Sequence, residues 1–565
     1  MKWAKKDNSI QTVEQLVIQN TGMTLEHLNK DTRVYQYPGI SEAADLFLDH
    51  VRRGSKIQVW CDYDTDGVDS KFIMSYTVAK PLKIRNISID CPGRYTDGYG
   101  IKPSIVEKFI GANLLVLCDN GIAAIEAIDL AREMGMDVIV LDHHEPRVID
   151  GKEVLPNANV IVDPHVTGGY IMEKNANGQL TQVGTFEDLC GAGIAYYFSH
   201  EVRSKCAWMS DKWRWYLDQV AVIGAAIGTV GDVVNLVDDN RRIVKQGISN
   251  MNKGMGTAGI QKLLARTYLQ SHVTSTDIGF TISPIVNAYG RLEDAGPNKI
   301  ANILCSDATE GDALSALDAD ITEAIEMNKK RKEMTRETVD RVIEMYEQNG
   351  GDDAFIVCYD EWTITGLVGL VAGELVSKYH KPALVFAPAK EDGVIKGSGR
   401  SVEGIDIKSL LDQVQQYLTT YGGHPMACGA SMLIENLDDF GDAINAITPV
   451  LEASDVLYYD IETTTDQAAN VLAEQEKLEP YGAGNPLPVY RFNSVFLGQP
   501  SYMGGNSEHI KFKVGDNDVV WFYGREGYEA LGSPEKVDML VTMSYHYFKD
   551  ETTIQMQVID LVPAD

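Results

Sequence analysis

Four aspartates lie within eight residues in the stretch CDYDTDGVDS, which directly follows the apolar run IQVW. The apolar run is typical of a buried strand, and it ends abruptly in the anionic stretch. Carboxylates crowded into one place repel each other unless protons or a cation neutralise them. Asp64 and Asp66, separated by one residue, can hold a cation in a tight loop. This stretch predicts a metal site whose other ligands come from elsewhere in the chain.

Two further polar segments also follow apolar runs. Asp119 comes after LLVLC, and the triplet Asp142-His143-His144 comes after VIVL. Adjacent histidines in this position would be unusual core residues, although structural hydrogen bonding is the alternative for an isolated pair. Carboxylates mixed with imidazoles suit Mn²⁺ or Mg²⁺, whereas structural zinc would be expected to recruit thiolates. The eight cysteines are scattered singly and are expected to be buried free thiols.

The segment from residue 56 to 162 alternates strand and helix patterns, which predicts a parallel α/β sheet. The expected strands are KIQVWC, ISIDC, NLLVLC, MDVIVL and NVIV. Open α/β sheets bind ligands in the crevice at the carboxyl ends of their strands. The three polar segments are therefore expected to meet in space.

The remainder of the chain predicts three further parts. An amphipathic helical segment from residue 213 leads to the glycine-flanked Asp232, and a long helix is expected from about 311 to 348. A second α/β pattern ends near residue 450, and five short strands within 489–565 suit a small barrel of the OB type. The predicted domains are 1–310, catalytic with an N-terminal extension; 311–350, a connecting helix; 351–450, substrate-binding; and 451–565, an OB-like nucleic-acid-binding domain.

Composition narrows the functional classes. The chain is 44% hydrophobic and 23% charged, as in soluble globular proteins, and no apolar run is long enough for a spanning helix. The N-terminus lacks the apolar segment of a secretory signal, so a cytoplasmic protein without membrane contact is expected. The net charge of −31 argues against nonspecific binding of nucleic acid by the whole surface, but it does not exclude a local positive site. The basic run at 329–336 is expected to be a solvated face of the long helix.

An ordered series of motifs extends from residue 56 to 490. It comprises CDYDTDG, VLCDNG, LDHHEP, LCGAG, IGTVGDVVNL, NAYGRLEDA, GSGRS, GGHPMACG and EPYGAGNPLP. On these motifs the chain resembles the DHH phosphoesterase superfamily and, within it, the RecJ-like exonucleases specific for single-stranded DNA. The resemblance implies a parallel-sheet DHH domain, a long connecting helix, a smaller α/β DHH-associated domain and a C-terminal OB-like barrel.

The resemblance also implies a catalytic centre with two divalent ions, Mn²⁺ or Mg²⁺. Two adjacent cations lower the pKa of a shared water and neutralise phosphoryl charge during in-line attack, so no nucleophilic side chain is needed. Asp62 and Asp142 are expected to orient the ligands, and His144 is expected to face the scissile phosphate. The implied metal ligands are Asp64, Asp66, Asp119, His143 and Asp232.

The implied substrate residues lie farther along the chain. Arg291 is expected to grip a phosphate near the metals, with pairing to Glu293 or Asp294 as the alternative. The glycines of GGHPMACG would let backbone amides approach phosphate oxygens, and His424 would donate a further hydrogen bond. The glycines in question are Gly422 and Gly423, which directly precede His424. A terminal 5′-phosphate would be held by Arg94, Ser398 and Arg400.

One segment departs from the family pattern. RecJ-like chains commonly carry Trp-His-Pro-Gly where this chain has EWTITGLVGLVAG, so the grip on substrate is in question while the metal ligands are unaffected.

The expected function is 5′ to 3′ hydrolysis of single-stranded DNA to nucleotide monophosphates, in DNA repair and recombination, by a monomer. A helicase or a single-strand-binding protein is a candidate partner. The alternatives are a DHH phosphodiesterase for short oligonucleotides or cyclic dinucleotides, and a noncatalytic single-strand-binding replication scaffold.

Overall fold

The computed structural model describes residues 2–149, 151–269, 272–451, 456–548 and 551–564. These residues form two compact units, which are treated separately below. The first unit comprises residues 1–91, 100–283 and 455–565, and the second comprises residues 92–99 and 284–454. Among the described residues, no helix combines the length and apolar character needed to cross a bilayer.

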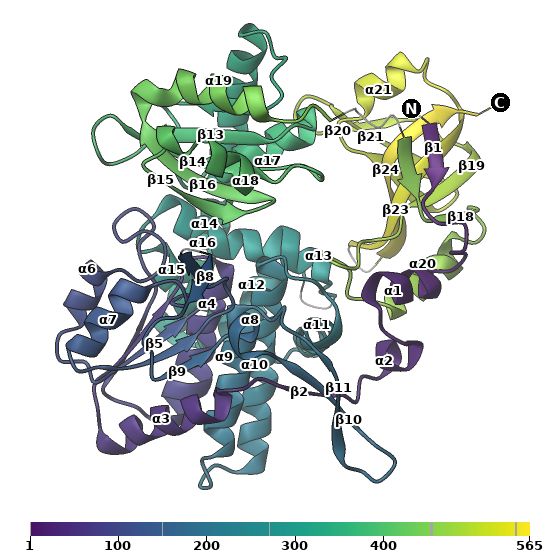
Figure 1. Cartoon of the computed structure of the whole chain (residues 1–565). Helices are drawn as coiled ribbons and strands as arrows, with labels where there is room; N and C mark the ends of the chain where they lie inside the picture. The colour runs from purple at the N-terminus through teal and green to yellow at the C-terminus, as the bar shows by residue number, and fades with distance from the viewer. Residues whose placement is uncertain (1, 150, 270–271, 452–455, 549–550, 565) are drawn as a thin grey trace. The chain divides into compact units, whose positions relative to one another are not determined.

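The first unit is built on a five-stranded parallel sheet in the order β4-β3-β5-β6-β9, as predicted for residues 56–162. The interior strands β3 and β5 are buried along their whole length because helices cover both faces of the sheet (Figure 1). The strands are β3 (Ile57–Cys61), β4 (Ile87–Asp90), β5 (Leu114–Cys118), β6 (Asp137–Leu141) and β9 (Val160–Val162).

The two faces of this sheet carry different sets of helices. On one face, α6 (Pro103–Val106) and α7 (Ile125–Glu133) pack against Trp60, Leu117 and Val140. On the other face, α4 and α9 contact the strands directly, and α10 packs against both helices. The helices on this side are α3 (Ile40–Arg53), α4 (Thr65–Phe72), α9 (Gly191–Ser204), α10 (Asp211–Gly231), α11 (Asp238–Asn252) and α12 (Ala258–Arg266).

A β-rich domain in the first unit contains a seven-stranded sheet in the order β18-β19-β23-β24-β22-β21-β20. Helices α1 (Val13–Thr21) and α20 (Ala468–Lys477) contribute to its hydrophobic core, so both ends of the chain build this domain. The N-terminal strand β1 (Lys2–Lys5) also pairs in parallel with β17 (Val456–Tyr459). The sheet strands are β18 (Ile461–Thr463), β19 (Tyr490–Phe496), β20 (Ser501–Met503), β21 (His509–Val514), β22 (Asn517–Trp521), β23 (Lys536–Phe548) and β24 (Glu551–Pro563).

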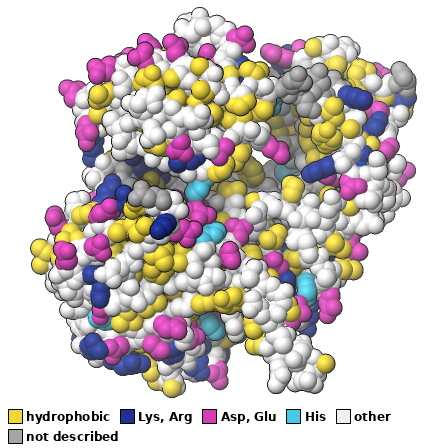
Figure 2. Space-filling view, in the orientation of Figure 1, with side chains coloured by type: hydrophobic (Ala, Val, Ile, Leu, Met, Phe, Trp, Pro, Cys, Tyr) yellow, Lys and Arg dark blue, Asp and Glu magenta, His cyan; other side chains and the backbone are white. Residues whose placement is uncertain are grey.

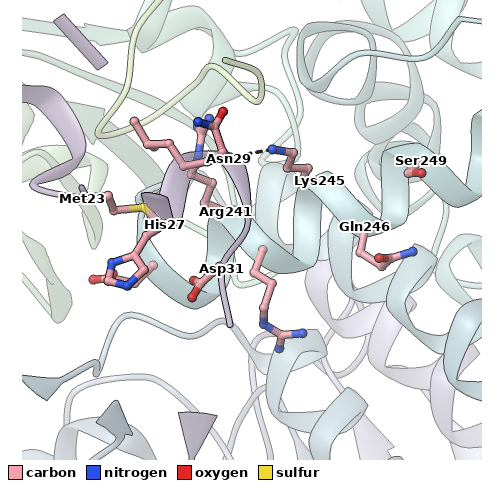
Figure 3. A pocket seen from close by; sticks show the side chains of 11 residues that line it. Met23, His27, Asn29, Asp31, Arg241, Lys245, Gln246 and Ser249 are labelled. Carbon is pink, nitrogen blue, oxygen red and sulfur yellow. Dashed lines mark hydrogen bonds between the residues drawn. The ribbon is translucent and has the colours of Figure 1, made fainter. Parts of the chain in front are cut away.

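Helix α11 joins the N-terminal segment to the β-rich domain. The Arg241 guanidinium donates to the carbonyls of Leu478, Glu479 and Pro480 at 2.6–3.0 Å. Lys245 donates to the carbonyl of Leu28, which lies in α2 (Leu25–Asn29), at 3.0 Å (Figure 3). A cavity of about 270 Å³ lies between α2 and α11, and none of the predicted site residues lines it. Arg241 and Lys245 thus connect α11 to the segment at 478–480 and to α2.

A small three-stranded sheet in the order β11-β10-β2 completes the first unit. Its strands are β2 (Val34–Gln36), β10 (Tyr170–Lys174) and β11 (Leu180–Thr185). The hairpin turn between β10 and β11 contains Asn175 and Gly178, whose backbone groups are hydrogen-bonded across the turn at 2.8 Å. All eight cysteines are free, and seven of them are buried, which confirms the expected thiols.

The second unit is a mixed α/β domain with a five-stranded sheet in the order β12-β13-β14-β16-β15. Helices α16 and α17 cover one face, and α18 and α19 cover the other. The predicted long helix is α16, which extends from Gly311 to Gln348. The other elements are β12 (Ile356–Tyr359), β13 (Ala383–Pro388), β14 (Val394–Arg400), β15 (Thr420–His424), β16 (Ala427–Leu433), α17 (Val368–Tyr379), α18 (Ile407–Gln413) and α19 (Leu437–Ile447).

Candidate metal centre and substrate-binding residues

The predicted metal ligands all lie in the first unit, at the carboxyl edge of its parallel sheet. Asp64 caps the N-terminus of α4, where its carboxylate accepts from the N–H groups of Asp66 and Gly67 at 3.1 and 3.2 Å. Asp119 follows β5 in a left-handed conformation with a φ of 62°. Its N–H donates to the carbonyl of Leu141 at 2.9 Å, which ties the turn after β5 to the end of β6.

His143 lies at the centre of these carboxylates. Its Nε2 is 3.2 Å from Oδ1 of Asp119 and 3.7 Å from both Oδ2 of Asp66 and Oδ2 of Asp232. The atom is buried and makes no hydrogen bond in this structure. Burial, together with the neighbouring His144, lowers the pKa of His143, which favours the neutral ring that can ligate a metal.

The first turn of α9 positions Asp66. The N–H groups of Gly191 and Ala192 donate to its two carboxylate oxygens at 2.6 and 2.8 Å. A Cβ at Gly191 would lie 2.6 Å from the Cβ of Asp119 and 2.9 Å from Oδ2 of Asp66. Glycine is therefore required where α9 approaches the carboxylates, and this explains the first glycine of the LCGAG motif.

Asp142 organises the turn after β6. It is buried and accepts from the N–H of Ile122, the N–H of His143 and Nδ1 of His144, each at 2.8 Å. Burial disfavours its charge, but His144 outweighs this effect and lowers the pKa of Asp142 to about 2. For His144, burial opposes the charged ring, while Asp142 raises the pKa to about 10. These hydrogen bonds fix the turn that carries both histidines.

The donor set fits divalent cations that prefer oxygen and imidazole ligands. Three overlapping groups each bring their ligand atoms within 4.8 Å of one another: Asp66, His143 and Asp232; Asp119, His143 and His144; and Asp62, Asp64 and Asp119. Burial, reinforced by neighbouring carboxylates, raises the pKa values of Asp119 and Asp232 well above the usual range. Cations bound among these groups would remove the cost of placing like charges together. The three groups contain carboxylates and imidazoles but no thiolate, which suits Mn²⁺ or Mg²⁺.

The predicted substrate residues all lie in the second unit, and the first group comprises Arg94, in the loop at 92–99, and Arg291. Nε of Arg94 donates to the carbonyl of Gly290 at 2.9 Å, and the N–H of Tyr95 donates to Asp294 at 2.6 Å. Arg291 donates through Nη1 to the carbonyl of Gly366 at 3.0 Å. Glu293 pairs with Lys299 at 3.3 Å. Arg94 and Arg291 are thus joined through the segment from Tyr289 to Asp294.

The second group lies on three neighbouring strands. Ser398 on β14 aligns with Gly429 on β16, which aligns with Gly422 on β15; Arg400 aligns with Ala427, which aligns with His424. Since side chains alternate along a strand, Ser398, Arg400 and His424 share one face of the sheet. Nη1 of Arg400 donates to Oγ of Ser398 at 3.1 Å, and burial lowers the pKa of Arg400. Gly423 has a φ of 142°, and His424 is exposed.

The segment that departs from the family pattern connects these two groups, which the sequence analysis did not anticipate. A Cβ at Gly366 would lie 2.7 Å from the hydroxyl of Tyr95, and one at Gly369 would lie 3.0 Å from Oγ of Ser398 and 3.3 Å from Nη2 of Arg400. The two glycines of TGLVG were the available signal, because their spacing marks two close backbone approaches within four residues.

Comparisons with known proteins agree with this architecture. The model of the DHH family N-terminal domain matches residues 56–222, the DHHA1 domain matches 352–448, and the RecJ OB domain matches 459–560. The single-stranded-DNA-specific exonuclease RecJ of Escherichia coli is 30% identical over 486 residues, covering 80% of this chain and 78% of that relative. The chain belongs to the RecJ family. The OB-like C-terminal domain and the α/β fold class are thereby confirmed.

Other RecJ proteins extend the comparison. RecJ of Bacillus subtilis is 30% identical over 550 residues, which are 94% of this chain but only 64% of that relative. The crystal structure of Thermus thermophilus RecJ in complex with Mn²⁺ superposes with a TM-score of 0.77 at 22% identity, covering 99% of this chain and 76% of that one. The chain thus spans about two thirds to three quarters of the length of these RecJ proteins.

Proposed function

We propose that this chain is a metal-dependent 5′ to 3′ exonuclease that hydrolyses single-stranded DNA and releases nucleotide 5′-monophosphates. The observation that carries the proposal is the convergence of Asp66, Asp119 and Asp232 around Nε2 of His143, with Asp64 in an adjoining group that shares Asp119. Relatives over most of the chain are named single-stranded-DNA-specific exonucleases. The proposed metal ligands are Asp64, Asp66, Asp119, His143 and Asp232.

The chemistry is divided between the ions and the chain. Two bound Mn²⁺ or Mg²⁺ ions would supply an activated water and neutralise charge on the phosphoryl oxygens. The chain supplies rigid ligands: the α9 amides fix both oxygens of Asp66, and Asp142 fixes the turn that carries both histidines. Because Asp142 holds Nδ1 of His144, the other ring nitrogen can serve as a donor toward the scissile phosphate. Asp62, in the same acidic loop as Asp64 and Asp66, would orient the metal ligands.

The proposed direction of digestion depends on the substrate residues of the second unit. A terminal 5′-phosphate would be held by Arg94, Ser398 and Arg400, where a guanidinium offers a planar pair of donors for two oxygens. Arg291 would contact a phosphate nearer the metals, and the backbone of Gly422 and Gly423 with His424 would hold the strand. A pocket that holds a terminal 5′-phosphate would enforce digestion from the 5′ end.

The acidic surface limits how the strand is bound. Asp and Glu side chains are spread over the face seen in Figure 2, in keeping with the net charge of −31. Such a surface repels a polyanion, so the metals and these arginines supply the local attraction. The same proposal places a monomeric enzyme in the cytoplasm, where a helicase or a single-strand-binding protein would supply unpaired strands.

The direct test is digestion of a long single strand labelled at its 5′-phosphate, with Mn²⁺ and with a chelator, beside a labelled dinucleotide. The proposal predicts that labelled mononucleotide is the first product, that duplex is resistant and that the chelator stops the reaction. Preferential cleavage of the dinucleotide would instead identify a short-oligonucleotide diesterase. Strand binding without cleavage would identify a scaffold.

A further inference from the structure

Strand β12 forms one edge of the sheet in the second unit, and half of its peptide groups point away from that sheet. The N–H of Ile356 donates to Pro382 at 2.9 Å, and the N–H of Asp360 donates to Phe386 at 3.1 Å. Ile356, Cys358 and Asp360 thus face β13. Because hydrogen-bonding directions alternate along a strand, the N–H and C=O groups of Val357 and Tyr359 face outward. The described residues place no strand beside this edge.

The neighbouring outward position shows that a peptide-like group fits against this edge. The side-chain amide of Asn445 on α19 accepts from the N–H of Phe355 at 2.8 Å and donates to its carbonyl at 3.0 Å. An added strand would make the same pair of bonds to a residue that it opposes. Asn445 therefore occupies the first outward position, while Val357 and Tyr359 are the next two.

A groove of about 560 Å³ runs along this edge between the C-terminal part of α16 and helix α19, and we call it the β12 groove. Tyr346 and Leu437 contribute apolar surface to its lining, and Val357 and Tyr359 also line it. Exposed strand edges are normally protected by lysine, by proline or by a covering element, because they add foreign strands readily. The four residues of β12, IVCY, include neither a charge nor a proline.

The charges around the β12 groove select the kind of strand that fits. Asp353, Asp438 and Asp442 line it, and no lysine, arginine or histidine does so. None of the three carboxylates takes part in an ion pair among the described residues. A nucleic-acid strand would be repelled by them, whereas a chain with lysine or arginine side chains would be attracted.

We propose that the β12 groove docks an extended, cationic segment of a partner protein, which adds to β12 as a further strand. Main-chain hydrogen bonds to Val357 and Tyr359 would give affinity, and the three carboxylates would select basic side chains. The basic run of this chain is not the occupant, because residues 329–336 are helical within α16.

The test uses the full-length protein and a fluorescein-labelled peptide of alternating lysine and valine, followed by fluorescence anisotropy. A peptide of alternating glutamate and valine is the charge control. We expect binding of the lysine peptide only, with slower hydrogen exchange at the amides of Val357 and Tyr359. Equal binding of both peptides, or protection elsewhere without protection at these amides, would overturn the proposal.

Three variants distinguish peptide binding at the β12 groove from nonspecific attraction to the acidic surface. Val357→Pro removes one outward N–H, which an edge strand tolerates, and should abolish binding. The double change Asp438→Asn with Asp442→Asn should weaken binding about fivefold, whereas Asp439→Asn should leave it unchanged. Exonuclease activity should be equal in all variants, which verifies folding. Loss of binding by Asp439→Asn to the same extent, or undiminished binding by Val357→Pro, would contradict a site in this groove.

Discussion

Nε2 of His143 lies 3.2 Å from Oδ1 of Asp119, although the two residues follow different strands of the sheet. Asp119→Asn should lower the exonuclease rate by about a thousandfold or more, because the variant loses a metal ligand. The bound metals are expected to stabilise the charged transition state by several kcal/mol. Asparagine tolerates the left-handed φ of 62° at this position, so the fold should remain. Activity with Mn²⁺ and thermal unfolding measure the two effects.

In the absence of metal, the same variant should be more stable than the wild type. Burial and four neighbouring carboxylates raise the pKa of Asp119, so its charge is unfavourable in the metal-free protein. Asp119→Asn should therefore unfold at a higher temperature than the wild type in a chelator, and it should lose the stabilisation that Mn²⁺ gives the wild type. Full activity of the variant would show that Asp119 is not a ligand.

Gly191→Ala tests how α9 supports the site. The added methyl would press on Asp119 and Asp66 at 2.6 and 2.9 Å, so both ligands must shift. We expect a fall in Mn²⁺ affinity of about ten- to hundredfold, measured by titration calorimetry, with a matching loss of activity at low metal concentration. Gly279→Ala is the matched control, because a Cβ there meets only Val230 at an ordinary 3.5 Å. Equal behaviour of the two variants would contradict the assigned role of Gly191.

Arg400→Gln tests recognition of the 5′-phosphate. Arg400 is held by Oγ of Ser398 and by the carbonyl of Gly399 at 3.1 and 2.8 Å, without a carboxylate in either bond. Loss of a charged bond to phosphate should raise KM for a 5′-phosphorylated strand by about ten- to hundredfold, while a 5′-hydroxyl strand is affected little. Lys408→Gln on α18 should change neither value. An equal loss for both strands would assign Arg400 a general structural role.

The strand-end ligands could be predicted because their positions follow from a local rule. Carboxyl ends of parallel strands meet at one edge, so Asp64, Asp119 and His143 were expected to converge. Asp232 lies at the end of α10, and no such rule brings it there; its place came from the resemblance. The bounds of α16 were also predictable, because Gly311 and the turn NGG interrupt a long helical pattern.

Contacts between distant segments could not be predicted from local patterns. The pairing of β1 with β17 joins residues about 450 positions apart, and nothing in KWAK specifies its partner. The hairpin of β10 and β11 was missed although Asn175 and Gly178 carry a turn signal. The predicted domain boundaries stay predictions, as do the roles assigned to Arg94, Arg291 and His424.

Glu479 should make stability depend on pH. Burial, with Glu476 and Asp277 nearby, raises its pKa to about 7 from 4.5, against the opposing effect of Arg241. The folded state then holds a proton that the unfolded state releases above about pH 4.5, so the free energy of unfolding should fall as pH rises to about 7. Glu479→Gln should remove this slope and gain up to roughly 3 kcal/mol at higher pH.

Chemical denaturation across this pH range measures the effect of Glu479. The exposed Glu526→Gln in the same unit is the control, and it should keep the wild-type slope. A slope that survives in Glu479→Gln would assign the pH dependence to other groups.

The most direct test of the account is the anomalous diffraction of a crystal grown with Mn²⁺. We predict two manganese peaks within bonding distance of Asp64, Asp66, Asp119, His143 and Asp232, with at least one carboxylate between the ions. A map in which these side chains hold no manganese, or in which the ions bind elsewhere in the first unit, would contradict the proposed metal centre.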